Sequence, residues 1–149
     1  MNNQEEDVRP LLHQLIRKFG LLNKTCCTAC ETGGVEISLV QSHILYEIDR
    51  QHEPSMLQIA ETLGIDITTF SRQIQTLSRK KLLRKSPSSS DRRVALLALT
   101  EQGEALVQSI DRQVQAYLQR IFNGMKPEEQ TGVIRSLQIL LKAMEQSGV

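Results

Sequence analysis

The sequence predicts a mainly α-helical fold with a small β-hairpin wing: a winged helix-turn-helix embedded in a helical dimer. Apolar residues recur at spacings of three and four through most of the 149-residue chain, which is typical of amphipathic helices. Two short helical segments between residues 55 and 81 are joined by a turn that contains glycine. Two apolar stretches of strand length then flank a serine-rich loop at residues 86–91.

The first predicted helix runs from about Glu5 to Ala29 and has a wide apolar stripe. Pro10 lies near its start, which indicates either a later start or a proline that the first turn tolerates. The pair Gly33-Gly34 interrupts the pattern. The stripe consists of apolar residues three or four positions apart, namely Val8, Leu11, Leu12, Leu15, Ile16, Phe19 and Leu22.

Two capping signatures mark the starts of the next helices. Ser38 is followed three residues later by Gln41, and Ser55 by Gln58. In each pair the serine side chain can accept from one unpaired backbone amide, and the glutamine side chain can accept from another. We therefore expect a longer helix that begins at Ser38 and a shorter one that begins at Ser55 and ends before Gly64.

A further helix and a β-hairpin follow. The helix is predicted from about Ile67 to Lys81, and its buried face consists of Ile67, Phe70, Ile74 and Leu77. Residues 82–85 are compatible with a strand, residues 86–91 with a turn and residues 94–99 with a second strand. We expect this hairpin, with its polar loop and basic flanks, to be the wing.

Two helices complete the chain. Thr100 is predicted to cap a long helix that ends near Phe122. Lys126-Pro127 begins the last helix, which ends near Gln146, because proline suits a first helical turn. Their apolar stripes consist of Leu106, Ile110, Val114, Leu118 and Ile121, and of Val133, Leu137, Leu140, Leu141 and Met144.

The apolar stripes at both ends of the chain are longer than a small winged domain can cover. Such faces indicate a partner surface, and a symmetric homodimer is the commonest solution. We predict a single domain over residues 1–149. Within it, residues 37–100 form the winged helix-turn-helix, with its head between Pro54 and Thr100, and residues 1–36 and 101–149 form the helical dimerisation region.

Basic residues are concentrated in the predicted head. Eight Lys or Arg and three Asp or Glu lie between residues 54 and 100, a local charge of +5, whereas ten basic and fourteen acidic residues elsewhere give −4. The charge of the whole chain, +1, conceals this difference. A basic region in an acidic surround indicates a polyanionic partner.

Several classes of protein are disfavoured. There is no apolar run of about 18 residues and no basic, apolar leader, so we expect no membrane contact and a cytoplasmic location. Three cysteines, an odd number, fit a reducing compartment. With 3% aromatic residues and no Trp, stacking on single-stranded bases is disfavoured. No glycine-rich phosphate loop, acid pair or serine elbow is present, so we predict no enzyme.

The exposed face of the predicted helix after Gly64 suits double-stranded DNA. It carries hydroxyls, amides and arginines, and no acid occurs between Ile67 and Ser90. Arginine suits guanine, glutamine suits adenine, and a threonine methyl can contact thymine. A solvated helix face, the alternative, usually mixes Glu with Lys. Because the N-terminal end normally carries the base contacts, we predict major-groove contacts from Thr68, Thr69, Ser71, Arg72 and Gln73, with Arg79 further along.

The wing is predicted to contact the DNA backbone and the minor groove. Arg92 and Arg93 at its tip could enter a narrow minor groove, where the negative potential is enhanced. Asp91 would hold an arginine in place through a charge-assisted bond, or would be an ordinary turn aspartate. Phosphate neutralisation would come from Lys80, Lys81, Arg84 and Lys85.

These motifs together resemble the MarR family of winged helix-turn-helix regulators. The resemblance covers nearly the whole chain and rests on residues 57–65, on Thr69 and Arg72, on Asp91-Arg92-Arg93 and on Leu99-Thr100-Glu101-Gln102-Gly103. It implies a homodimer whose first and last helices interlock, with two winged heads on a pseudo-palindromic operator. It also implies repression that a ligand or thiol oxidation relieves.

The resemblance assigns two residues and has two departures. Arg93 matches the wing-tip arginine of the family, and Asp91 matches its supporting acid. Lys81 stands where the family commonly has glycine after the recognition helix, so the exit into the wing is expected to differ. Lys126 replaces a serine-like cap, which is expected to weaken the start of the last helix modestly.

The cysteines form one cluster, Cys26, Cys27 and Cys30. If the first helix continues this far, Cys30 lies within one turn of both others. Such thiols could bind a thiophilic metal or metalloid ion, or one could oxidise and be resolved by another. They could equally be small buried residues. No cofactor is certain, and the metal is unknown.

Three functions therefore stand beside one another. The first is a non-enzymatic transcriptional regulator, a repressor that a small molecule, thiol oxidation or a soft metal releases from double-stranded DNA. The second is a thiol-dependent sensor or metal-binding protein for which DNA contact is incidental. The third is a winged module whose basic face binds an acidic protein.

Overall fold

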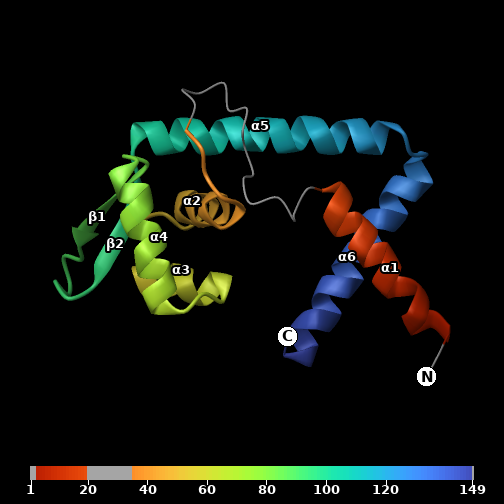
Figure 1. Ribbon diagram of the computed structural model, residues 1–149, viewed down its shortest axis with the longest axis horizontal. Helices are drawn as coiled ribbons and strands as arrows, with labels where there is room; N and C mark the ends of the chain where they lie inside the picture. Colours follow the sequence, from red (N-terminus) through yellow and green to blue (C-terminus); the bar gives the residue numbers. More distant parts are fainter. Residues whose placement is uncertain (1–2, 20–34, 149) are drawn as a thin grey trace. The chain divides into compact units, whose positions relative to one another are not determined.

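A computed structural model of the protein describes residues 3–19 and 35–148. This part of the chain forms six helices and one antiparallel two-stranded sheet (Figure 1). The predicted mainly α-helical fold with a β-hairpin is confirmed. In chain order the elements are α1 (Asn3–Lys18), α2 (Leu39–Gln51), α3 (Met56–Leu63), α4 (Ile67–Arg79), β1 (Leu83–Pro87), β2 (Ala95–Leu99), α5 (Glu101–Asn123) and α6 (Pro127–Ser147).

Helix α1 begins earlier than predicted. Because it starts at Asn3, Pro10 lies in its interior and not in its first turn. Proline lacks an N–H, so the helix loses one internal hydrogen bond there. The helical bonding extends to Phe19, whose N–H donates to the carbonyl of Leu15 over 2.9 Å. The predicted continuation to Ala29 lies outside the described residues.

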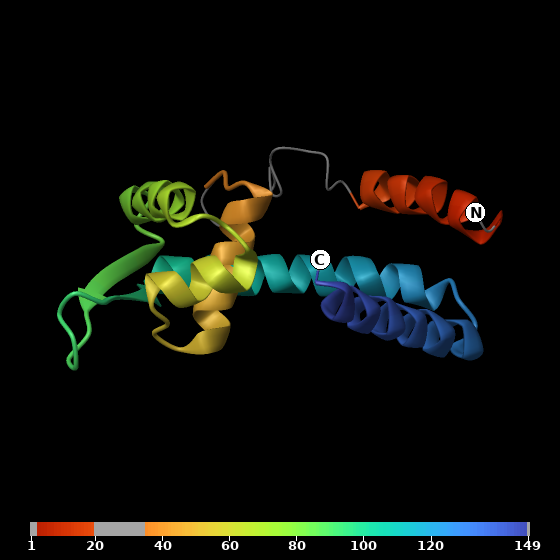
Figure 2. The same ribbon diagram turned by 90° about the horizontal axis from the view of Figure 1, so that it is seen from below.

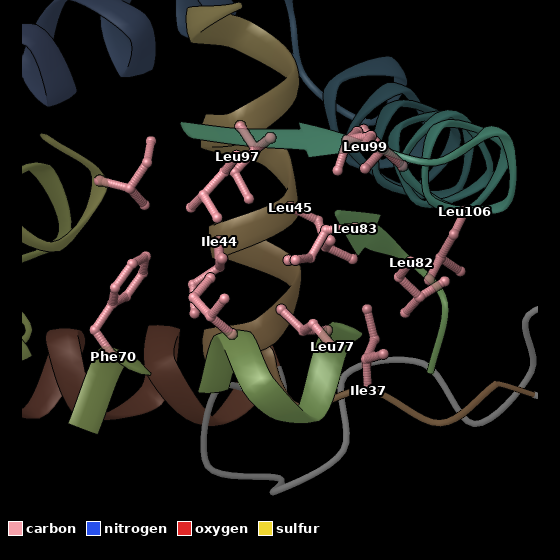
Figure 3. Close-up of a cluster of buried hydrophobic side chains, with 14 of the residues drawn as sticks. Ile37, Ile44, Leu45, Phe70, Leu77, Leu82, Leu83, Leu97, Leu99 and Leu106 are labelled. Atoms are coloured by element: carbon pink, nitrogen blue, oxygen red, sulfur yellow. The ribbon is translucent and has the colours of Figure 1, made fainter. Parts of the chain in front are cut away.

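The buried core belongs to the winged helix (Figure 3). It combines one face each of α2, α3 and α4 with the hairpin and the first turns of α5. The prediction that Ile67 is buried is wrong, because its side chain is 49% exposed. Ile67 is the first residue of α4, and its side chain lies beyond the core. The core side chains include Ile37, Ile44, Leu45, Ile59, Phe70, Ile74, Leu77, Leu82, Leu83, Leu97, Leu99 and Leu106.

The wing is a short antiparallel hairpin. Its first strand, β1, begins one residue later and ends two residues later than the predicted strand at residues 82–85. Leu83 pairs with Leu99, and Pro87 pairs with Ala95, so Pro87 belongs to the strand and not to the turn. The N–H of Leu97 also donates to the carbonyl of Pro54 over 2.8 Å. This bond ties β2 to the chain that enters α3.

Both predicted capping boxes are present. The Ser38 hydroxyl accepts from the Gln41 amide over 3.2 Å, and the Gln41 side chain accepts from Ser38 N over 3.1 Å. At α3, Ser55 and Gln58 exchange the equivalent bonds over 3.1 and 2.7 Å. Gly64 then ends α3 in the left-handed conformation, with φ of 63°.

The start of α5 lies against the backbone that leaves α4. The Thr100 hydroxyl accepts from Gly103 N over 3.1 Å and donates to the carbonyl of Lys81 over 2.6 Å. Thr100 N donates to the carbonyl of Leu82 over 3.1 Å. A Cβ at Gly103 would lie 1.9 Å from that same Leu82 oxygen. The Thr-x-x-Gly motif is therefore a structural joint, which we call the Thr100–Gly103 joint.

The chain divides into two compact units, residues 1–110 and 111–149. The first includes the start of α5 because Leu106 and Val107 lie in the winged-helix core. In the second, no residue of α6 is buried. Its exposed apolar side chains are Ile134, Leu137, Ile139, Leu140, Leu141 and Met144.

The cap of α6 is incomplete, as expected from Lys126. The Lys126 side chain makes no capping bond, although its N–H donates to Glu129 Oε2 over 2.8 Å. Among the described helices, none has a stretch long and apolar enough to cross a membrane.

Two helix ends, at Gly64 and at Lys81, allow a comparison within the chain. At both positions φ is positive, 63° at Gly64 and 59° at Lys81, and two nested backbone bonds close the preceding helix. Near Lys81 these run from Lys81 N to the Ser78 carbonyl and from Leu82 N to the Leu77 carbonyl. Lysine at this position pays a steric cost that glycine does not. Lys81 therefore differs from glycine in residue type only, because the backbone of this turn keeps the left-handed conformation that glycine prefers.

Gly103→Ala is expected to lower the free energy of unfolding by about 1–3 kcal/mol, because the added methyl displaces α5 from the Leu82 carbonyl. Urea denaturation monitored by circular dichroism measures this. Gly132→Ala in α6 is the matched control: its Cβ would meet nothing within 4 Å. The control should be neutral or stabilise by up to about 1 kcal/mol. Equal effects of the two substitutions would contradict the close approach at Gly103.

Lys81→Gly is expected to raise the free energy of unfolding by about 0.5–1 kcal/mol, since it removes the left-handed cost of about 1–2 kcal/mol and adds unfolded-state entropy. Gly64→Ala should do the opposite by a similar amount, because its Cβ meets nothing within 4 Å and only conformation is at stake. Thermal and urea unfolding measure both. A loss of stability in Lys81→Gly would rule out backbone strain at this turn.

Candidate DNA-binding surface

Helix α4 has one buried face and one exposed face. Phe70, Ile74 and Leu77 are fully buried and point into the core. The opposite face presents the polar residues that the sequence singled out. Thr68, Thr69, Ser71, Arg72, Gln75 and Arg79 are exposed.

Asp66 caps the N-terminus of this helix. Its Oδ1 accepts from the backbone N–H groups of Thr68 and Thr69 over 3.1 and 3.0 Å. The hydrogen bond from the Thr69 side chain, followed by these amides, lowers the pKa of the Asp66 carboxyl. The cap therefore satisfies amides that would otherwise attract a phosphate. Because the Thr68 N–H is engaged by Asp66, Thr68 can contact DNA through its side-chain hydroxyl.

Two side chains predicted to contact DNA also form hydrogen bonds to the segment around the start of α2. Gln73 is half-buried, and its Oε1 accepts from Gln41 Nε2 over 3.0 Å. The ammonium group of Lys80 donates to the carbonyl of Glu36. Sequence reasoning missed the role of Gln41, although the glutamine in its capping box was a signal. Arg72 is the cationic residue among the five predicted at the N-terminal end of α4 to contact bases, and its side chain is exposed.

The wing tip places an acid beside an arginine. Asp91 Oδ1 accepts from the Arg93 N–H over 3.0 Å and lies 3.5 Å from Arg93 Nε. The Asp91 carbonyl also accepts from Val94 N over 3.0 Å. Asp91 therefore closes the turn, and its carboxylate forms an exposed ion pair with the Arg93 side chain. The Arg93 side chain is 94% exposed, so the guanidinium is held at one side and remains open to solvent.

The rest of the wing is basic and accessible. Arg84 and Lys85 are exposed on β1, and Arg92 is exposed in the loop. Figure 2 shows the hairpin extending away from α2, α3 and α4. An exposed ion pair such as Asp91–Arg93 contributes little to folding. Its effect is on the position of the guanidinium.

The cysteine cluster cannot be placed in this surface. Cys26, Cys27 and Cys30 lie outside the described residues. Within residues 3–19 and 35–148, no group of three His, Cys, Asp or Glu side chains could hold a metal ion.

Residues 37–95 match the MarR family. The predicted resemblance to the MarR family is confirmed over this segment. This segment begins at the buried Ile37 and ends on β2, so it covers the helix-turn-helix and most of the wing. Members of the MarR family are transcription regulators, so the match over this segment supports the predicted class of DNA-binding regulator.

Individual MarR relatives support the same fold. The chain is 22% identical over 145 residues to the HTH-type transcriptional regulator YfiV of Bacillus subtilis (strain 168), covering 97% of this chain and 88% of that protein. The DNA complex of Streptococcus pneumoniae FabT has a TM-score of 0.85 at 21% identity, covering 95% of this chain and 98% of that one.

A third similarity concerns a regulator with a known effector. Bordetella bronchiseptica BpsR, whose DNA binding is regulated by 6-hydroxynicotinic acid, has a TM-score of 0.67 at 25% identity. The match covers 90% of this chain and 98% of that one.

Proposed function

We propose that this protein is a MarR-type homodimeric repressor that binds a pseudo-palindromic site on double-stranded DNA. The observation that carries the proposal is the exposed face of α4, which holds Arg72 and no carboxylate between Ile67 and Ser90. Such a face can donate to base edges in the major groove. The exposed Arg93 of the wing supports the same proposal, since arginine suits the narrow minor groove.

The residues of this surface have different roles in the proposal. Thr68, Ser71 and Arg72 lie on the exposed N-terminal half of α4, where a recognition helix makes its base contacts. Arg79 and Lys85 neutralise phosphates, which gives affinity without sequence choice. Lys80 uses one of its three ammonium donors on the Glu36 carbonyl, and the other two are left for a phosphate.

The homodimer is supported by apolar surface on helices from both ends of the chain. On α1, the apolar side chains from Val8 to Ile16 are 37–63% exposed, and α6 has no buried residue. An uncovered apolar face on a soluble helix indicates a partner surface. Residues 1–36 and 101–149 are proposed to form the dimerisation region, with the winged heads at residues 37–100. Two heads related by a two-fold axis favour half-sites about one helical turn apart.

The full chain is expected to select a pseudo-palindromic duplex from a random pool and to bind it with a steep salt dependence. Arg72→Ala should lower affinity about fivefold to a hundredfold and relax the choice at one base pair per half-site. Arg93→Ala should weaken all duplexes and reduce the salt slope by about one per subunit. Fluorescence anisotropy at several salt concentrations measures both.

The control is Lys142→Ala, which removes an exposed charge from α6. It should leave affinity and salt slope unchanged. If the wild-type chain binds no duplex at low salt, the proposal fails. A chain that binds an acidic protein instead would support the alternative winged interaction module.

The releasing signal is proposed to be a small molecule, thiol oxidation or a soft metal ion. The regulated DNA binding of BpsR supports a small organic effector for a protein of this fold. The three clustered thiols in the sequence support the other two, because soft ions and oxidants both act on thiolates.

Replacement of Cys26, Cys27 and Cys30 by Ser separates these signals. If the thiols sense, oxidant, zinc or arsenite should lower the DNA affinity of the wild-type chain by at least about tenfold, and the triple variant should not respond. DNA titrations with each addition measure this. An unchanged response in the variant would assign the cysteines to packing. Absence of any response in the wild-type chain would leave the small molecule as the signal.

A further inference from the structure

A series of side-chain hydrogen bonds connects the start of α2 to the proposed recognition helix α4. The Ser38 N–H donates to Gln41 Oε1 over 3.1 Å, and Gln41 Nε2 donates to Gln73 Oε1 over 3.0 Å. Gln41 is only 9% exposed, and Gln73 is half-buried at the margin of the exposed face of α4. We call these three groups the Gln41–Gln73 relay.

The first donor fixes the direction of every bond in the relay. A backbone N–H can only donate, so the Gln41 atom that faces Ser38 must be the carbonyl oxygen. The NH2 group of Gln41 then faces Gln73 and donates to it. Gln73 must therefore turn its oxygen toward Gln41, and its NH2 group occupies the other end of the amide. A glutamine without such a partner could present either end, because the amide flips readily.

The backbone that leads into the relay is also held against the end of α4. The Lys80 ammonium group bonds to the Glu36 carbonyl, one position before the buried Ile37. Ile37 lies in the same core cluster as Leu77 (Figure 3). The lead-in to α2 is thus held against α4 at Gln73 and at Lys80. Neither end of the relay can shift without disturbing the core between them.

We propose that Gln41 is a positioning residue for base recognition: it makes Gln73 present a hydrogen-bond donor to the major groove. This inference rests on the proposed DNA binding. Guanine offers the acceptors O6 and N7 there, whereas cytosine offers the N4 amino donor. The relay therefore favours guanine over cytosine at the base opposite Gln73. It disfavours the bidentate contact with adenine that a free glutamine makes, because that contact needs the oxygen that Gln41 engages.

Gln41→Glu reverses the relay while keeping the capping box. Glutamate at the third helical position still accepts from the Ser38 N–H. A carboxylate has no proton to donate, so the Gln73 amide must turn its NH2 group toward position 41 and its oxygen toward the DNA. We expect the preference at that base to change from guanine to cytosine, by about threefold to tenfold in each direction, the effect of one hydrogen bond.

The experiment first finds the base and then tests it. Selection from random duplexes with the full wild-type chain and with Gln73→Ala identifies the base pair whose preference depends on Gln73. Duplexes with guanine or cytosine at that position are then titrated with the wild type and with Gln41→Glu. Gln58→Glu is the matched control, because it adds the same charge to the α3 capping box, outside the relay. It should leave the guanine preference intact.

Two results would overturn the inference. One is a guanine preference that persists in Gln41→Glu. The other is an equal loss of affinity for every duplex, which would assign Gln73 to a phosphate or to packing. Urea unfolding checks that the variants are folded. If Gln41→Glu is not, Gln41→Met frees the Gln73 amide and should admit adenine. Absence of all DNA binding by the wild type would instead refute the proposed function.

Discussion

The winged helix depends on one close approach of two backbones, at the Thr100–Gly103 joint. The first turn of α5 lies so near the Leu82 carbonyl that a Cβ at Gly103 would be 1.9 Å from its oxygen. Thr100 bonds at the same point to the carbonyls of Lys81 and Leu82. These contacts join two segments of the chain. One is the turn between α4 and β1, and the other is the turn between β2 and α5. The orientation of the wing relative to the recognition helix is set there.

Lys81 shows that this joint also constrains the turn after α4. The chain must reverse between the buried Leu77 and the buried Leu82, and the two nested backbone bonds that close α4 require a left-handed residue at position 81. Glycine meets that requirement at Gly64 without strain. Lysine meets it at position 81 because the core and the Thr100 hydroxyl hold both sides of the turn. The surrounding contacts compensate for a residue that local preference would not choose.

The elements that the sequence predicted best are those set by local chemistry. The capping boxes at Ser38 and Ser55 and the Thr100 cap need only residues three positions apart, and all three are present. Burial of Ile67 was predicted wrongly because helical spacing does not reveal where a core ends along a helix axis. In the candidate site, the exposure of Arg72 follows from periodicity. The engagement of Gln73 by Gln41 does not, since the two residues are 32 positions apart and meet only through packing.

The internal bonds of the head also limit which groups remain for DNA. Asp66 engages the amides of Thr68 and Thr69, Gln41 engages the oxygen of Gln73, and Glu36 engages the ammonium group of Lys80. Each bond fixes a side chain or helix end before any partner arrives, which lowers the ordering cost of association. It also uses part of the hydrogen-bonding capacity of that group. The exposed arginines, on α4 and at the wing, keep their full set of donors. Affinity in such a head comes mainly from arginine and phosphate, and sequence choice comes from the few oriented groups between them.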